Sequence, residues 1–255
     1  KNLIPLWIPV TVLALVGILV LIGSKWIHKF EKATLITGFL LAVAIQVLLQ
    51  LIYPFPMDEI VRSDGANSFL TPALQYSPTE ILARFPFFTP QLPIHAKTNM
   101  PGKILFFHLL TVFTKDPQIM GYMIIAISTL GGLLLYGITN RLFHDRTVSF
   151  YSFVLYALIP SKQEFMPILN TVTPVFILLC LYLFLIYLDS KKRRFLLLLG
   201  VSLYFLVLFE PTPLVMGILF ISLLAYALVQ RKISPRHLID ITFFTILAFG
   251  ATYLL

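Results

Sequence analysis

Long apolar runs, each close to the length of a membrane-spanning helix, recur along almost the whole chain. A helix needs about 20 apolar residues to cross a bilayer, and such runs begin near residues 3, 33, 117, 174 and 238. Hydrophobic residues make up 58% of the sequence and charged residues 12%, where a soluble domain carries about 25% charged residues. This chain cannot hide its apolar surface in a water-soluble core. The sequence therefore predicts an all-α, integral, multi-pass membrane protein.

The runs predict a single transmembrane domain, 1–255, with about eight spanning helices. The run at 102–114 is an exception, because thirteen residues rise only about 20 Å as a helix, and we predict that it lies at the membrane interface. The chain begins without Met and ends inside an apolar run, so we expect it to be part of a longer polypeptide. The predicted spans are 3–23, 33–53, 117–139, 148–159, 174–188, 195–209, 214–229 and 238–255.

Short basic clusters between the runs indicate the orientation of the helices. Clusters at 25–32, 140–146, 189–194 and 230–237 hold most of the 19 Lys and Arg residues but few of the 11 acids. If 102–114 does not span, all four clusters lie on one side, which the positive-inside rule assigns to the cytoplasm. The net charge of +8 then reflects membrane topology, and we expect no nucleic-acid partner. The loop 54–116 is predicted to face the extracytoplasmic side, of a bacterial plasma membrane rather than the endoplasmic reticulum.

Polar side chains outside these clusters concentrate between Pro54 and Lys103. Connections longer than about 12–15 residues are uncommon unless they are functional. A carboxylate here could act as a base for an acceptor hydroxyl, nearby acids and a histidine could hold a divalent metal, and cations could bind a lipid-linked phosphate. We therefore predict that the external loop 54–116 is the catalytic loop. Its ionisable residues up to Lys103 are Asp58, Glu59, Arg62, Asp64, Glu80, Arg84, His95, Lys97 and Lys103.

The order of these features resembles the GT-C superfamily of polyprenyl-phosphate-sugar-dependent membrane glycosyltransferases. That group includes protein O-mannosyltransferases, aminoarabinose transferases and bacterial cell-envelope sugar transferases. The similarity covers about 33–229 and lies in layout and short motifs. Here an acidic motif follows a span, Asn99-Met100-Pro101-Gly102 precedes an interface helix, and a later span ends in the basic turn Arg141-Leu142-Phe143.

The resemblance implies an inverting transfer from a polyprenyl-phosphate-linked sugar to a lipid, glycan or protein acceptor, with an external Asp as the base. Asp58, in Asp58-Glu59, and Asp64, in Asp64-Gly65, both match that position. Many members carry a His-Pro-Pro motif where this chain has Asn99 to Gly102, with His95 upstream, and Asn170 stands where some members have a second Asp. The predicted substrate-binding residues are Glu59, Arg62, His95, Lys97, Asn99, Lys103 and Lys162.

Two other classes remain open from the sequence. One is a transporter or a flippase for lipid-linked saccharides, and the other is a scaffold subunit. Transporters place ionisable groups near the bilayer midplane and show paired halves, whereas this chain has no charged residue in the middle of a span and no repeat. Asp58 could simply close a helix and Asp64 could form a turn. Gln46 and Gln50, one helical turn apart, are predicted to bond a neighbouring helix.

Overall fold

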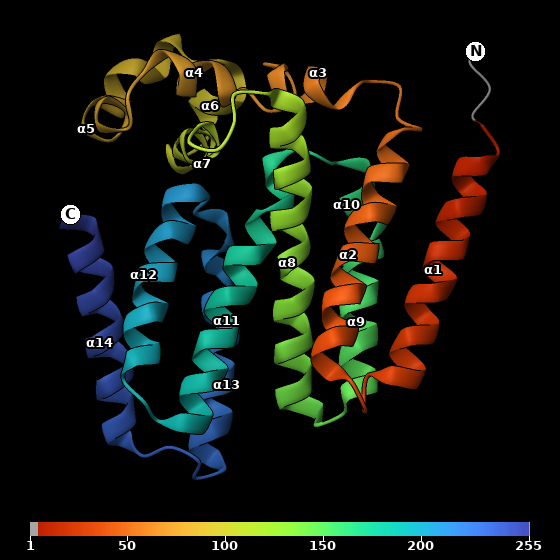
Figure 1. The fold of residues 1–255 in the computed structure, drawn as a ribbon. Helices are drawn as coiled ribbons and strands as arrows, with labels where there is room; N and C mark the ends of the chain where they lie inside the picture. Colours follow the sequence, from red (N-terminus) through yellow and green to blue (C-terminus); the bar gives the residue numbers. More distant parts are fainter. Residues whose placement is uncertain (1–4, 255) are drawn as a thin grey trace.

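The computed structural model describes residues 5–254, apart from the side chain of Ser24. This part of the chain is helical and contains no strand. The longer helices lie side by side as a bundle (Figure 1). The start of the first predicted span, residues 3 and 4, falls outside the described residues. The bundle helices are α1 (Trp7–Trp26), α2 (Glu31–Gln50), α8 (Pro117–Phe143), α9 (Arg146–Leu158), α11 (Thr173–Ser190), α12 (Arg194–Phe209), α13 (Gly217–Val229) and α14 (Pro235–Leu254).

Five segments of the described chain are long and apolar enough to cross a membrane. The protein is thus a helical membrane protein with five such segments, where the sequence predicted about eight spans. The other three bundle helices have shorter apolar stretches: α9 has 13 residues and α12 has 16, and the apolar stretch of α1 is Trp7–Gly23. Helix α9 stops early because Pro160 disfavours a helical conformation at the residue before it. The five segments are Glu31–Gln50, Pro117–Phe143, Leu169–Ser190, Thr212–Val229 and Pro235–Leu254.

Local capping fixes both ends of the central helix α8. Asp116 accepts a hydrogen bond from a backbone N–H of the first turn, and Pro117 occupies the first helical position, where its missing N–H costs nothing. At the other end His144 adopts a left-handed conformation, with φ of 54°. Asp145 then caps α9 by accepting the Thr147 N–H at 2.7 Å. This short turn makes α8 and α9 antiparallel neighbours.

Residues 54–116, called the cap below, fold into short helices over one end of the bundle (Figure 1). The sequence predicted a long loop here, and the structure shows that most of it is helical. Buried apolar side chains of the cap, including Phe69 and Ile104, share one cluster with Leu169 and Phe209 from the bundle side. The cap is therefore fixed to the bundle by a common core. Its helices are α3 (Met57–Arg62), α4 (Leu70–Gln75), α5 (Pro78–Phe88), η1 (Thr89–Gln91), α6 (Ile94–Thr98) and α7 (Gly102–Thr111).

Helix α7 lies across the end of the bundle rather than along it (Figure 1), in the segment predicted to be interfacial. It packs against α4 on the cap side and against the end of α12. Gly102 permits this contact, because a Cβ atom there would lie 2.4 Å from the Leu208 carbonyl oxygen. The first residue of α7 is therefore in close contact with the backbone of α12.

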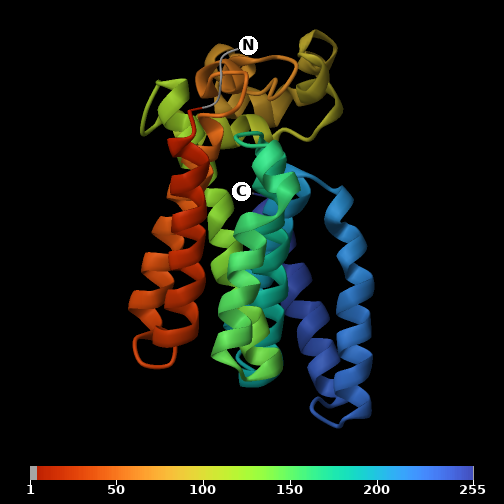
Figure 2. The ribbon, with the colours of Figure 1, turned by 90° about the vertical axis from the view of Figure 1, so that its right-hand side faces the viewer.

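The turns between α1 and α2, α8 and α9, α11 and α12, and α13 and α14 all lie at the end of the bundle opposite the cap (Figures 1 and 2). Three ion pairs join neighbouring helices at this end. Arg141 contacts Asp189 at 2.7 Å, Arg146 contacts Glu31 at 3.1 Å, and Arg193 contacts Asp240 at 3.1 Å. The basic clusters of the sequence thus gather at one end and the cap at the other.

Candidate active site between the cap and the bundle

A cavity of about 540 Å³ lies where the cap meets the bundle. Its walls come from the cap, from the end of α9 and from the segment between α9 and α11, which contains α10 (Pro160–Glu164) and η2 (Leu169–Thr171). The volume falls in the usual range for small-molecule sites, about 300–1,000 Å³. The cavity is lined by Gly65, Ala66, Phe69, His95, Asn99, Tyr156, Ile159, Ser161, Lys162, Phe165, Ile168, Asn170, Thr171 and Pro174.

Lys162 places a buried positive charge in this cavity. Its side chain is 7% exposed, and its Nζ donates one hydrogen bond, to Thr129 Oγ1 at 3.3 Å. The ammonium also lies 4.8 Å from the centre of the Tyr156 ring. No carboxylate of the described residues forms an ion pair with it. Burial lowers the pKa of Lys162 from 10.5 to about 7, because water no longer stabilises the charged form.

The two groups that contact Lys162 are held by further hydrogen bonds. Gln46 of α2 donates to Thr129 Oγ1 at 2.8 Å, which confirms the prediction that Gln46 bonds a neighbouring helix. The same prediction for Gln50 is not confirmed, because its buried Nε2 has no hydrogen-bond partner among the described residues. The Tyr156 hydroxyl donates to the Ser128 carbonyl at 3.1 Å. The position of the Lys162 ammonium is therefore set by α2, α8 and α9 together.

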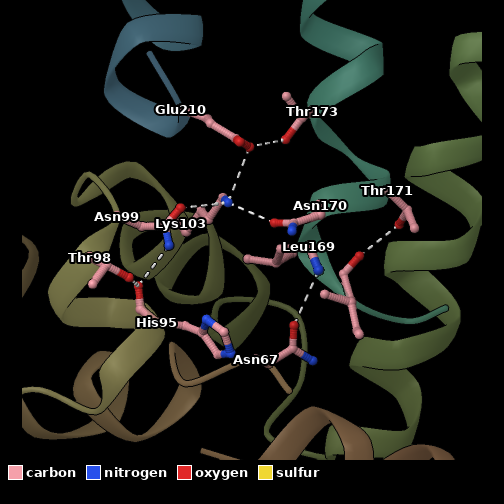
Figure 3. A network of polar contacts seen from close by, with 11 residues as sticks. Asn67, His95, Thr98, Asn99, Lys103, Leu169, Asn170, Thr171, Thr173 and Glu210 are labelled. Atoms are coloured by element: carbon pink, nitrogen blue, oxygen red, sulfur yellow. Dashed lines mark hydrogen bonds and ion pairs between the residues drawn. The ribbon is translucent and has the colours of Figure 1, made fainter. Parts of the chain in front are cut away.

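A second lysine beside the cavity, Lys103, is neutralised by its neighbours (Figure 3). It is 1% exposed, and its Nζ donates to Asn99 Oδ1 at 2.8 Å and to Asn170 Oδ1 at 2.7 Å. It also pairs with Glu210 Oε2 at 3.2 Å, and that oxygen accepts the Thr173 hydroxyl at 2.8 Å. An ammonium has three N–H donors, and here all three have partners. Lys103 thereby joins α7, η2 and the end of α12, and the substrate contact that the sequence predicted for it stays a prediction.

Asn67 holds the cap to the connector before α11, and His95 joins two segments within the cap. The His95 Nε2 atom lies 2.9 Å from the Gly65 carbonyl oxygen, so this ring links α6 to the turn after α3. Asn67 is fully buried and accepts the Leu169 N–H at 3.2 Å, while its amide donates to the Ile60 carbonyl at 3.2 Å. These bonds hold in place the cap segments that carry the lining residues His95 and Asn99.

The predicted catalytic acids, Asp58 and Asp64, are not part of the cavity lining. Asp58 is half-buried in the first turn of α3, together with the exposed Glu59. Asp64 is exposed, accepts a long hydrogen bond from Thr71 at 3.4 Å, and directly precedes the lining residue Gly65. Asp64 is therefore adjacent in the chain to a lining residue, whereas Asp58 is not.

Of the other predicted residues, the cavity brings together His95, Asn99 and Lys162. Arg62 and Lys97 are exposed on α3 and α6 and do not line it. In residues 5–254, no group of three His, Cys, Asp or Glu side chains is close enough to hold a metal ion.

The sequence did not predict the roles of Tyr156, Thr129 and Glu210. Tyr156 and Thr129 look like ordinary polar residues of apolar helices, and only their contacts with Lys162 distinguish them. For Glu210 a signal existed, because it stands between Phe209 and Pro211 at a helix end beside the apolar face of the bundle. A carboxylate in such a place needs a cationic partner.

The chain was compared with family models, curated proteins and solved structures. No family model, no curated protein and no solved structure matches it. The function of the protein is therefore inferred from its own residues.

Proposed function

We propose that the protein is a membrane glycosyltransferase of GT-C-like layout that takes its sugar from a polyprenyl-phosphate-linked donor. The observation that carries this proposal is the buried Lys162 ammonium, which lines the cavity without a carboxylate partner. Burying a charge without a counter-ion is costly. A ligand phosphate entering the cavity would supply the missing negative charge and repay that cost. The cavity lies where the cap covers the apolar bundle, which suits a ligand with a phosphate head and a hydrocarbon tail.

The distribution of charge supports an extracytoplasmic cap. The turns at the far end carry the basic clusters, and Lys and Arg are enriched in cytoplasmic loops. In this reading α1, α9 and α12 also cross the membrane with the five longer segments, giving eight crossings, and α7 lies at the outer interface. The donor then enters from the outer leaflet, and the acceptor, a lipid, a glycan or a protein, approaches from outside.

The proposed reaction is an inverting displacement at the anomeric carbon. An acceptor hydroxyl oxygen attacks that carbon as the bond to the phosphate oxygen breaks, and the hydroxyl proton passes to a cap carboxylate, Asp64 or Asp58. The polyprenyl phosphate leaves with the electron pair of the broken bond. Lys162 stabilises the negative charge that develops on the leaving oxygen, as a fixed cation does in a site shielded from water.

The test is sugar transfer by the purified protein in detergent or proteoliposomes, with radiolabelled mannosyl-, glucosyl- and aminoarabinosyl-polyprenyl phosphates as donors and a membrane lipid extract as acceptor. We expect transfer by the wild type and a loss of at least 100-fold in Lys162→Met and in Asp64→Asn or Asp58→Asn. Lys115→Met, at an exposed cap lysine, is the matched control and should retain activity. Absence of transfer from every donor, or full activity when both acids are replaced, would rule the proposal out.

A further inference from the structure

Two lysines lie at the same cavity in opposite electrostatic states. Lys162 lines the cavity and has no carboxylate partner among the described residues. Lys103, behind the wall formed by Asn99 and Asn170, is paired with Glu210 at 3.2 Å. The cavity therefore has one corner with an uncompensated positive charge and one corner that is electrically neutral but polar.

The chemistry of Lys103 determines how the neutral corner presents its amides. An ammonium only donates hydrogen bonds, so the oxygens of Asn99 and Asn170 must face it, at 2.8 and 2.7 Å. Their NH₂ groups then point away from Lys103. The oxygen and nitrogen of an amide have nearly the same shape, so these hydrogen bonds decide which of the two atoms faces Lys103.

The two amides then differ in what their NH₂ groups meet. The Asn99 NH₂ donates to the His95 carbonyl at 2.8 Å, so that amide is satisfied on both sides. The Asn170 NH₂ makes no hydrogen bond within the described residues, and Asn170 lines the cavity. Figure 3 shows the Asn170 oxygen turned toward Lys103 and its nitrogen turned away. The neutral corner thus offers two N–H donors in one plane.

Building on the function proposed above, we infer that Asn170 is the sugar-recognition residue of the cavity and that Lys103, held by Glu210, is its positioning residue. Paired N–H donors without net charge match the neighbouring hydroxyl oxygens of a neutral sugar. The phosphate of the same donor is drawn to the corner that holds Lys162, because in the described part of the chain the Lys162 ammonium has no carboxylate partner, whereas Lys103 is paired with Glu210. The donor therefore lies with its phosphate toward α10 and its sugar toward η2 and α6.

The test compares two phosphodiester probes of equal charge that differ only in the sugar: a polyprenyl methyl phosphate, called the bare phosphate, and the same lipid phosphate carrying mannose or glucose in place of the methyl group. Dissociation constants are measured in detergent for the wild type, Asn170→Leu and Asn170→Gln. Leucine has a similar size and no charge, so it removes the donors without repelling phosphate. We expect Asn170→Leu to weaken the sugar-bearing probe about tenfold, as for loss of one or two neutral hydrogen bonds, and the bare phosphate less than twofold. Asn170→Gln keeps an amide and should recover part of that affinity.

The positioning role of Lys103 is tested by a double-mutant cycle. Lys103→Met should reduce the preference for the sugar-bearing probe in the wild-type background, because the Asn170 amide is then free to turn. It should have no such effect in the Asn170→Leu background, whereas a purely structural role would lower both affinities in both backgrounds. Thermal unfolding of each variant shows whether it is folded.

Three results would overturn this inference. One is an equal loss for both probes in Asn170→Leu, which would place the amide on the phosphate. The second is no loss for either probe, and the third is additive effects in the cycle. If the wild type binds neither probe, the proposed function fails and the inference fails with it. If the wild type binds both probes but the variants do not separate them, only the inference fails.

Discussion

Replacing Lys162 by methionine should make the protein more stable while abolishing donor binding. Lys162 is 7% exposed and its pKa is lowered to about 7 by burial. A fall from 10.5 to about 7 corresponds to about 4–5 kcal/mol lost by the charged form. Methionine has a similar length and needs no hydration, but it gives up the contacts with Thr129 and Tyr156. We therefore expect a net gain of about 2–4 kcal/mol in the free energy of unfolding at pH 7.

The pH dependence of this gain follows from proton binding. Between pH 7 and about 10.5, the unfolded chain keeps a proton on Lys162 that the folded protein has released. Because the unfolded state binds more protons in this window, the stability of the wild type rises with pH there. From pH 7 to pH 9 the rise is about 2 kcal/mol, and Lys162→Met has no such dependence. The difference between the two proteins should therefore shrink as the pH rises.

The assay is thermal unfolding in detergent micelles at pH 7 and pH 9, with Lys115→Met as the matched control. We expect a higher unfolding temperature for Lys162→Met at pH 7, a smaller difference at pH 9, and no effect in the control. In parallel, Lys162→Met should no longer bind polyprenyl phosphate. A variant less stable than the wild type at pH 7, or a difference that does not change with pH, would show that Lys162 has a counter-charge and would refute this reasoning.

Three further predictions concern the cap and the cavity. Affinity for the sugar–phosphate diester should fall as the pH rises through about 7, by about tenfold between pH 6 and 8, because Lys162 binds phosphate only when protonated; isothermal titration at both values checks this, and Lys162→Met should show no binding at either pH. Asn67→Leu leaves buried backbone groups unpaired and should cost about 2–4 kcal/mol, seen as earlier unfolding and faster proteolysis of the cap. Gly102→Ala places a Cβ 2.4 Å from the Leu208 carbonyl and should lower the unfolding temperature, whereas Gly217→Ala, with nothing within 4 Å, should not. Unchanged stability in either destabilising variant would contradict the packing described for it.

The helices were largely predictable because their signals are local. The apolar run at 117–139 and the Asp116–Pro117 pair predict α8, and the structure extends it only to Phe143. The short run after Gly102 predicted a helix that does not follow the bundle axis, and α7 lies across its end. The prediction of about eight spans was confirmed only in part, because apolar helices form at 148–159 and 195–209 as predicted but α9 and α12, with 13 and 16 residues, are shorter than the roughly 20 residues that a crossing needs.

The candidate site was only partly predictable because its walls come from distant segments. His95, Asn99 and Lys162 could be chosen by residue type, and they line one cavity. Whether a lysine is free or neutralised depends on what lies beside it in space. Lys103 meets Glu210 from a helix far along the chain, whereas Lys162 pairs with no acid of residues 5–254, and no sequence spacing distinguishes the two.

The bond between Asn67 and Leu169 constrains the order in which the protein can be assembled during synthesis. The cap is translated before α8, yet its buried Asn67 amide needs the backbone N–H of Leu169, which follows α9. Until Leu169 has been synthesised, the side-chain oxygen of Asn67 lacks this hydrogen bond, and we expect it to stay exposed to water. We therefore expect the cap to reach its final packing only after the hairpin of α8 and α9 has been inserted. A nascent chain arrested before Leu169 should have a cap that proteases cleave easily.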